Sequence, residues 1–116
     1  MTSLTISDRN LEMIQCAQTK YQRTYRYHLP KTIFQLQDVE NLTYESQSFD
    51  TVIDTFGLCA CEDPVQALKE MARVTKPEGK ILLLEHGRGK YSWMNEILDK
   101  DATTHAKVCA FAVRVC

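Results

Sequence analysis

The sequence predicts an α/β fold in which parallel strands are covered by helices. Strand-like and helix-like segments alternate along most of the chain, which is the order that places helices over a parallel sheet. The run 81–84 is apolar at every position. A strand without alternation is usually covered on both faces, which is typical of a parallel sheet under helices. The length of 116 residues accommodates one domain or part of one.

The first third of the chain predicts two strands with a helix between them. A short apolar and β-branched run at 4–6 indicates the first strand. Asn10 stands where a helix N-cap would be, and apolar side chains at three- and four-residue intervals predict an amphipathic helix over 10–22. Period-two alternation predicts a second strand over 32–36.

The middle of the chain predicts a loop, a strand and a helix. Residues 39–48 are polar and indicate a loop with a short helical turn, and 49–56 predict a third strand stopped by Gly57. Asp63 and Pro64 begin a helix, because an acidic cap precedes a proline at the first helical position. The stripe expected to be buried on that helix consists of Val65, Leu68, Met71 and Ala72.

The last third predicts a turn, a strand and a helix. Lys76 suits a helix C-terminus, and Pro77 with Gly79 forces a turn that leads into the strand 81–84. Residues 92–106 have the apolar spacing of a last helix.

Composition and charge favour a soluble intracellular chain, cytoplasmic by default. The net charge of −1 gives no drive toward nucleic acid or an anionic membrane, and no apolar run approaches the roughly 20 residues of a membrane span. The first residues lack the basic and apolar parts of a signal peptide. The five cysteines are odd in number and lack zinc-site spacing, so we expect reduced structural thiols and no metal site.

Polar residues follow the predicted strands, where an open α/β sheet binds its ligand. An Asp at such a position can accept hydrogen bonds from both hydroxyls of a ribose, and a second Asp can accept one from the exocyclic amine of adenine. Asp8 and Asp38 are so placed, and Val39 is an apolar neighbour that would pack against the ring. A nucleoside site fits these residues. The alternative is that they are polar loop starts and helix caps.

Three segments carry a resemblance to a known family. The segment 38–42 followed by 48–52 resembles a methyltransferase pattern in which an Asp–apolar pair precedes an "sFDvV" strand. The segment 63–86 resembles the following helix, its "RvLkPgG" turn and the next strand, and 8–14 resembles the earlier "D-x-S-x-x-M-L" element. Over roughly residues 4–106 the chain therefore resembles a class I S-adenosylmethionine-dependent methyltransferase with a methyltransferase type 11-like domain.

The resemblance implies a Rossmann-like parallel sheet flanked by helices and S-adenosylmethionine as the cofactor. It places the ribose on Asp8 and the adenine amine on Asp38, with Val39 beside the ring, and it lines the methionine and methyl end with Thr55 to Leu58. The methyl acceptor stays open among a small thiol, a quinone precursor, a lipid and a protein.

The resemblance names no general base. Glu85 and His86 are the ionisable pair near the expected reaction centre, and a histidine can act at neutral pH, although a structural role is the alternative. The Glu-His ending followed by 87–89 is similar to methyltransferase-like membrane-associated proteins and fungal mitochondrial relatives, so a mitochondrial location is the alternative to the cytoplasm.

The chain departs from the family pattern at both ends. The family begins with a strand and a G-x-G-type loop, but no glycine precedes Gly57. We therefore expect 1–116 to be one partial domain, without that central strand and without the C-terminal strands. The neighbours of the missing strand would keep unpaired backbone groups or pair with each other. The segment 107–116 diverges from the relatives, and its β-propensity marks an aggregation hazard.

Three other functions compete with an active methyltransferase. A dehydrogenase would need the glycine fingerprint that the chain lacks. A non-catalytic methyltransferase remnant would keep the fold and could self-associate through exposed strand edges. An RNA-binding module would use the mixed cations and aromatic rings of 20–28, which otherwise form a solvated helix end whose tyrosines half-cover the sheet.

Overall fold

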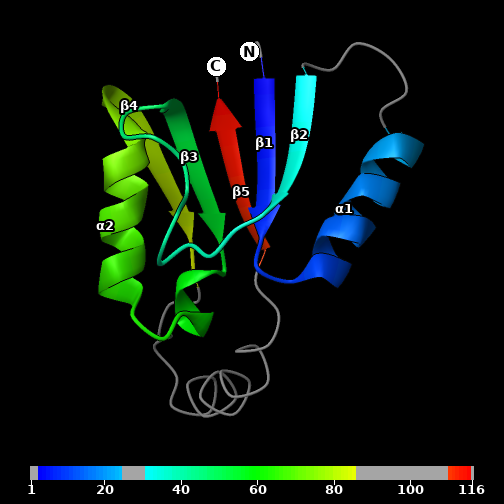
Figure 1. The fold of residues 1–116 in the computed structure, drawn as a ribbon, viewed down its shortest axis with the longest axis horizontal. Coiled ribbons are helices and arrows are strands. Elements are labelled where there is room, and N and C mark those ends of the chain that lie inside the picture. The colour runs from blue at the N-terminus through cyan, green and yellow to red at the C-terminus, as the bar shows by residue number, and fades with distance from the viewer. Residues whose placement is uncertain (1–2, 25–30, 86–109, 116) are drawn as a thin grey trace, which may run out of the picture.

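The computed structural model describes residues 3–24, 31–85 and 110–115, which form one five-stranded sheet with two helices against it (Figure 1). In chain order the elements are β1 (Ser3–Asp8), α1 (Leu11–Thr24), β2 (Lys31–Leu36), β3 (Phe49–Thr55), the 3₁₀ helix η1 (Leu58–Ala60), α2 (Pro64–Val74), β4 (Thr75–Leu84) and β5 (Ala110–Val115).

The strand order across the sheet is β2-β1-β5-β3-β4. β1 and β2 pair in parallel, as do β3 and β4. α1 packs on β1 and β2, whereas α2 packs on β4 and η1. The predicted α/β class, with parallel strands flanked by helices, is confirmed. The predicted helix over 92–106 lies outside the described residues.

β5 occupies the centre of the sheet and runs antiparallel to both neighbours (Figure 1). Val113 is the register partner of Thr5 in β1 and of Val52 in β3. The expectation that β1 and β3 would pair with each other or remain unpaired is therefore wrong. The β-propensity that marked this segment as an aggregation hazard is also the property that lets it form a strand.

α1 begins at its predicted cap and packs on the sheet through a tyrosine. The Asn10 side chain accepts a hydrogen bond from the backbone N–H of Glu12 at 2.8 Å. The Tyr21 ring meets the Phe34 ring edge-on at a centroid distance of 5.6 Å, and the Tyr21 hydroxyl accepts a hydrogen bond from Thr32 at 2.7 Å. Tyr21 thus covers part of the sheet, as the alternative to an RNA-binding role predicted.

α2 begins at the predicted Asp63 cap but buries a different stripe from the predicted one. The Asp63 side chain accepts a hydrogen bond from the backbone N–H of Gln66 at 3.0 Å. Val65, Leu68 and Ala72 are exposed, so only Met71 of the predicted stripe is buried. Two faces of the helix share the same apolar spacing, and contacts with distant residues decide which one turns inward. The buried residues of α2 are Ala67, Met71 and Val74.

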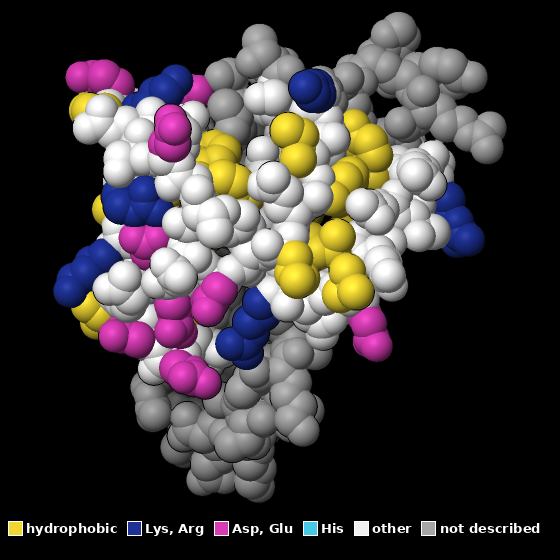
Figure 2. Space-filling model, in the orientation of Figure 1, with side chains coloured by type: hydrophobic (Ala, Val, Ile, Leu, Met, Phe, Trp, Pro, Cys, Tyr) yellow, Lys and Arg dark blue, Asp and Glu magenta, His cyan; other side chains and the backbone are white. Residues whose placement is uncertain are grey.

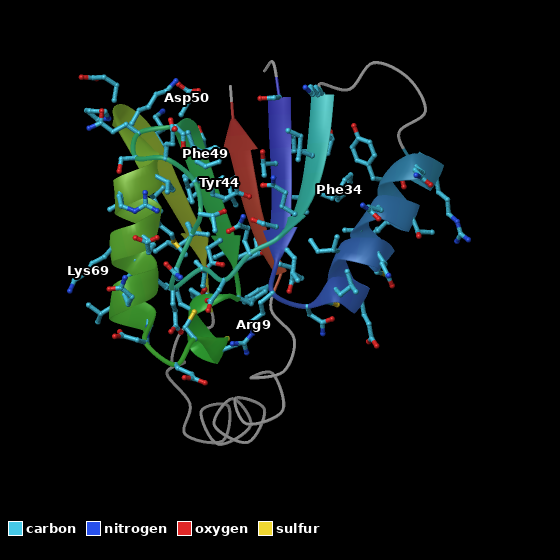
Figure 3. The ribbon with its side chains drawn as sticks, viewed as in Figure 1. Arg9, Phe34, Tyr44, Phe49, Asp50 and Lys69 are labelled. Carbon is cyan, nitrogen blue, oxygen red and sulfur yellow. The ribbon has the colours of Figure 1, made fainter. Side chains whose placement is uncertain are left out.

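The main apolar core lies between α2 and the sheet. Tyr44 packs its ring edge-on against Phe49 at 4.9 Å, beside this core (Figure 3). Arg73 holds the chain before β3 in place, because its guanidinium donates to the backbone oxygens of Leu42 and Tyr44 at 2.9 and 2.8 Å. The buried members of the core are Leu42, Phe49, Val52, Met71 and Val74.

The loop before β3 and the first half of β4 correct two details of the sequence prediction. Residues 39–48 form a loop whose turn is closed by a bridge between Asp38 and Asn41, with no helix. The turn expected at Pro77 and Gly79 interrupts β4 itself, since the register jumps between Phe49–Thr75 and Thr51–Lys80. Gly79 is required there, because an added Cβ would lie 2.8 Å from the backbone oxygen of Asp50.

Candidate functional site

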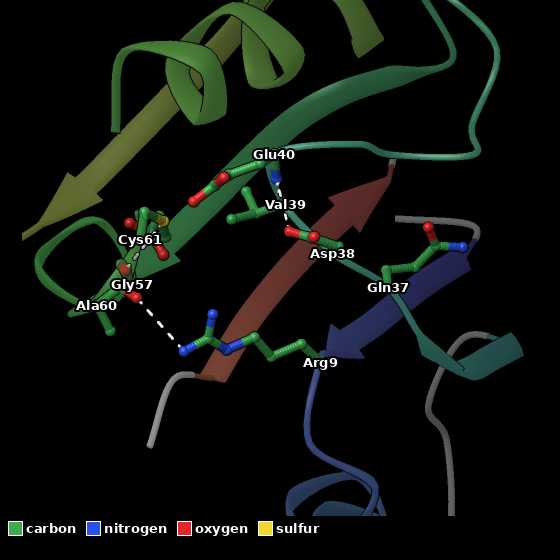
Figure 4. A pocket seen from close by; sticks show the side chains of 9 residues that line it. Arg9, Gln37, Asp38, Val39, Glu40, Gly57, Ala60 and Cys61 are labelled. Atoms are coloured by element: carbon green, nitrogen blue, oxygen red, sulfur yellow. Dashed lines mark hydrogen bonds between the residues drawn. The ribbon is translucent and has the colours of Figure 1, made fainter. Parts of the chain in front are cut away.

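The candidate site lies where the parallel strands end. The backbone N–H of Gln37 donates to the backbone oxygen of Asp8 at 3.0 Å, and that of Phe56 donates to Leu84 at 2.7 Å. These bonds align the ends of β1 with β2 and of β3 with β4. A pocket opens at this edge (Figure 4). It is lined by Arg9, Gln37, Asp38, Val39, Glu40, Asp54, Gly57, Ala60 and Cys61.

Asp8 is buried at the end of β1, with only 3% of its surface exposed. One carboxylate oxygen accepts a hydrogen bond from the backbone N–H of Asn10 at 2.7 Å. The other, Oδ2, is buried and has no hydrogen-bond partner among the described residues. Burial raises the pKa of Asp8, against the opposing hydrogen bond from Asn10 and the charge of Arg9. An orphaned buried oxygen of this kind is a ready acceptor for ligand hydroxyls.

Asp38 and Val39 enter the pocket from the loop after β2. Asp38 is exposed, and one of its carboxylate oxygens accepts a hydrogen bond from the backbone N–H of Glu40 at 3.0 Å (Figure 4). Val39 is half-buried and packs against the apolar core. Asp8 does not line this pocket but a neighbouring recess between β1 and α1. The Asp8–Gln37 backbone bond nevertheless places Asp8 beside the strand that carries Asp38.

Glu40 fixes the loop that carries Asp38, and sequence reasoning missed it. Its Oε1 accepts hydrogen bonds from the backbone N–H groups of Glu62 and Asp63 at 2.6 and 3.0 Å. Its backbone oxygen also accepts one from the Gln66 side chain at 3.3 Å. The loop is therefore attached to the first turn of α2. No local signal could reveal this contact, because 22 residues separate Glu40 from Glu62.

Thr55 and Leu58, expected at the methionine end, lie beside the pocket rather than in its lining. Thr55 ends β3 and is half-buried. The Leu58 side chain packs against the apolar core. The Leu58 backbone N–H donates to two carboxylates, at 3.2 Å to Asp54 and at 3.1 Å to Glu85.

Asp54 is a second residue that sequence reasoning missed. Its side chain is completely buried, and its Oδ1 has no hydrogen-bond partner among the described residues. Burial, followed by the hydrogen bond and charge of Glu85, raises the pKa of Asp54 to about 7, while the backbone N–H groups of Leu58 and Gly57 act in the opposite direction. Gly57 leaves the room for this carboxyl, since an added Cβ there would overlap it. The available signal was an acid directly after the apolar pair Val52 and Ile53 of β3.

Charge at this edge is predominantly acidic. Figure 2 shows acidic side chains gathered toward the lower part of the face, beside a basic side chain. Arg9 extends across the strand ends toward η1, where its guanidinium donates to the backbone oxygen of Ala60 at 3.4 Å (Figures 3 and 4).

Glu85, one of the two weak catalytic candidates, is half-buried next to Asp54, and His86 lies outside the described residues.

The residues of this edge fit a nucleoside. Carboxylates stand on two adjacent strand ends, the buried Oδ2 of Asp8 lacks a partner in the described part of the chain, and Val39 offers an apolar surface.

Among the described residues, no helix is long and apolar enough to cross a membrane. Cys16, Cys59 and Cys61 form no disulfide within the described part of the chain, and Cys16 and Cys59 are exposed rather than buried.

Comparison with known proteins gives consistent results. A family model described as a methyltransferase domain matches residues 2–83. The chain is 35% identical to the mitochondrial methyltransferase OMS1 of Saccharomyces cerevisiae, over 88% of this chain and 24% of that protein. It is 51% identical to the ubiquinone/menaquinone biosynthesis C-methyltransferase UbiE of Bdellovibrio bacteriovorus, over 47% of this chain and 23% of that protein.

The fold is also found among solved structures. The crystal structure of the YcgJ protein from Bacillus subtilis matches with a TM-score of 0.66 and 26% sequence identity, over 81% of this chain and 39% of that one. UbiE of Rickettsia akari is 37% identical over 81% of this chain and 37% of that protein. The chain thus spans between about a quarter and two-fifths of these proteins.

Proposed function

Because the chain belongs to the methyltransferase domain family, we propose that its strand-end edge, which comprises the pocket of Asp38 and the neighbouring recess of Asp8, binds S-adenosylmethionine for methyl transfer to an acceptor. The observation that carries this proposal is the alignment of Asp8 and Asp38 on adjacent strand ends through the bond between Gln37 and Asp8. Family membership supplies the cofactor class, and the geometry supplies residues that suit its adenosine part.

The residues of this edge would each have a separate task. Asp8 accepts hydrogen bonds from the ribose hydroxyls through its orphaned Oδ2. Asp38 accepts one from the adenine amine, and Val39 packs against the ring. Glu40 holds that loop against α2. The bound cofactor supplies a methyl group on a positively charged sulfur, and the protein's contribution is chiefly to align this group with the acceptor.

The relatives indicate where the search for an acceptor begins. The UbiE proteins are named as C-methyltransferases of ubiquinone and menaquinone biosynthesis, so a ring carbon of a quinone precursor is the first acceptor to test. The yeast relative is named as mitochondrial, so mitochondria are the first compartment to test, with the cytoplasm as the alternative.

Calorimetric titration with S-adenosylhomocysteine tests the cofactor proposal. Asp8→Asn retains the shape of the side chain and an oxygen for Asn10, but it removes the charge that favours the ribose hydroxyls. Asp38→Ala removes the acceptor for adenine. Asp50→Asn is the matched control, because Asp50 lies at the start of β3, at the opposite end of the sheet (Figure 3).

We expect micromolar binding, equivalent to about −8 kcal/mol, in the wild-type chain and in Asp50→Asn. Binding should be weakened at least about tenfold in Asp8→Asn and Asp38→Ala, the loss expected for a hydrogen bond to a charged group. The absence of binding to a folded wild-type chain would contradict the proposal. Equal affinity in all four proteins would show that the ligand binds elsewhere.

A further inference from the structure

The carboxyl groups of Asp54 and Glu85 form a pair at the ends of β3 and β4. Both accept the backbone N–H of Leu58, at 3.2 and 3.1 Å, so their oxygens converge on one hydrogen atom. Asp54 lines the pocket, is completely buried, and retains an oxygen without a hydrogen-bond partner in the described part of the chain. We propose that this carboxyl pair is a cation-binding subsite for the methionine end of the methyl donor.

The fold alone does not explain this pair. Placing two carboxyls together in a buried position is costly unless a cation or a proton compensates them. The ion pairs recorded among the described residues join Arg73 to Glu70 and Lys76 to Asp50, and neither includes Asp54 or Glu85. The two acids therefore hold a negative charge, or a shared proton, at the edge where the ligand is expected.

The surrounding chain is shaped to keep the pair in place. Gly57 has no side chain, and any Cβ at this position would overlap the Asp54 carboxyl. The backbone N–H of Leu58, the first residue of η1, donates a hydrogen bond to both acids. Two adjacent features thus preserve a buried acid that apolar packing alone would not require. This combination indicates a binding role for the pair.

The inference rests on the proposed function, which supplies the ligand. S-adenosylmethionine carries two cations at its methionine end, the α-ammonium and the sulfonium. S-adenosylhomocysteine keeps only the ammonium, and 5′-methylthioadenosine has neither group. A carboxyl pair attracts either cation through the same charge-assisted contact. These three ligands therefore separate the two sources of positive charge.

Calorimetric titration of the three ligands into wild type, Asp54→Asn, Glu85→Gln and Asp50→Asn tests the inference. The first two substitutions keep side-chain shape and remove charge, and Asp50→Asn is the control for loss of a carboxylate elsewhere in β3. We expect Asp54→Asn and Glu85→Gln to weaken S-adenosylmethionine at least about tenfold and to leave 5′-methylthioadenosine within about twofold. Circular dichroism checks that each variant is folded. If Asp54→Asn does not fold, the titrations of Glu85→Gln alone test the inference.

The pattern across the ligands decides the outcome. Equal weakening of S-adenosylhomocysteine supports the subsite and identifies the ammonium, whereas its unchanged affinity supports the subsite and identifies the sulfonium. If the variants weaken all three ligands equally, or none of them, the inference is overturned while the proposed function stands. If wild type binds none of the three ligands, the proposed function itself is overturned, and the inference with it.

Discussion

Asp54 and Glu85 accept a hydrogen bond from the same backbone N–H, that of Leu58, at 3.2 and 3.1 Å. This relationship connects the ends of β3 and β4 to the first residue of η1. It also makes the stability of this edge depend on pH, because one of the two acids titrates near neutrality. The groups that act on Asp54 are Glu85 and the backbone N–H groups of Leu58 and Gly57. The pKa of the nearby Cys59 thiol is raised by burial first, and then by the charges of Glu85 and Asp54.

The raised pKa of Asp54 predicts that this residue destabilises the folded state at neutral pH. Burial and Glu85 raise the pKa from 3.8 to about 7. Between these values the folded chain holds a proton that the unfolded chain has released, so the contribution of Asp54 to stability falls as pH rises and is constant above about pH 7. By linkage, Asp54→Asn should gain up to about 4 kcal/mol relative to wild type over this interval.

Urea unfolding of wild type and Asp54→Asn at pH 5, 6, 7 and 8 measures this difference. The free energy of unfolding of the variant should rise relative to that of wild type from pH 5 to about pH 7 and then level off. A difference that stays constant with pH would contradict the assigned titration. Asp50→Asn, in which an exposed salt bridge to Lys76 is removed, should parallel wild type and serves as the control.

Gly57 and Asp54 should be coupled through space. Gly57 has a φ of −86°, which any residue can adopt, so only the lack of room opposes a side chain there. Gly57→Ala should lower the free energy of unfolding by about 1–3 kcal/mol, as overpacking does. In the double variant Asp54→Ala/Gly57→Ala the added methyl group has space, and the cost of Gly57→Ala should largely disappear. A double-mutant cycle by urea unfolding measures the coupling, and strict additivity would contradict the overlap.

Glu40 should affect ligand binding without contacting the ligand. Glu40→Ala removes the acceptor for the backbone N–H groups of Glu62 and Asp63, so the loop of Asp38 loses its attachment to α2. We expect a loss of about 1 kcal/mol in stability, as for an N-cap, and weaker binding of 5′-methylthioadenosine. Glu45→Ala, an exposed glutamate of the same loop, is the control and should change neither quantity. Lower stability with unchanged affinity would restrict Glu40 to a purely structural role.

Features that depend on neighbours in sequence were predictable. The Asn10 and Asp63 caps involve partners two and three residues away, and both are present. Asp38 and Val39 could be placed at the pocket for a related reason, because the end of a parallel strand determines which edge of the sheet its next residues occupy. The order of elements, and with it the fold class, follows from the same local patterns.

Features that depend on distant contacts were not predictable. The buried face of α2 is set by interactions such as those of Arg73 with Leu42, 31 residues away, and helical periodicity fits either face. Asp54 gains its importance from Glu85 and from the clearance at Gly57. The central place of β5 requires pairing with β1 across more than 100 residues, which no local pattern contains.

β5 should be essential for folding, because it contributes the central strand of the sheet. Val113 pairs with Thr5 on one side and Val52 on the other. Proline has no N–H and is not tolerated within a central strand, so Val113→Pro should abolish cooperative unfolding in urea and increase the chain's apparent size on gel filtration. Val113→Thr retains the N–H and a β-branched side chain, and it should remain folded. A folded, cooperative Val113→Pro chain would mean that β1 and β3 close the sheet without β5.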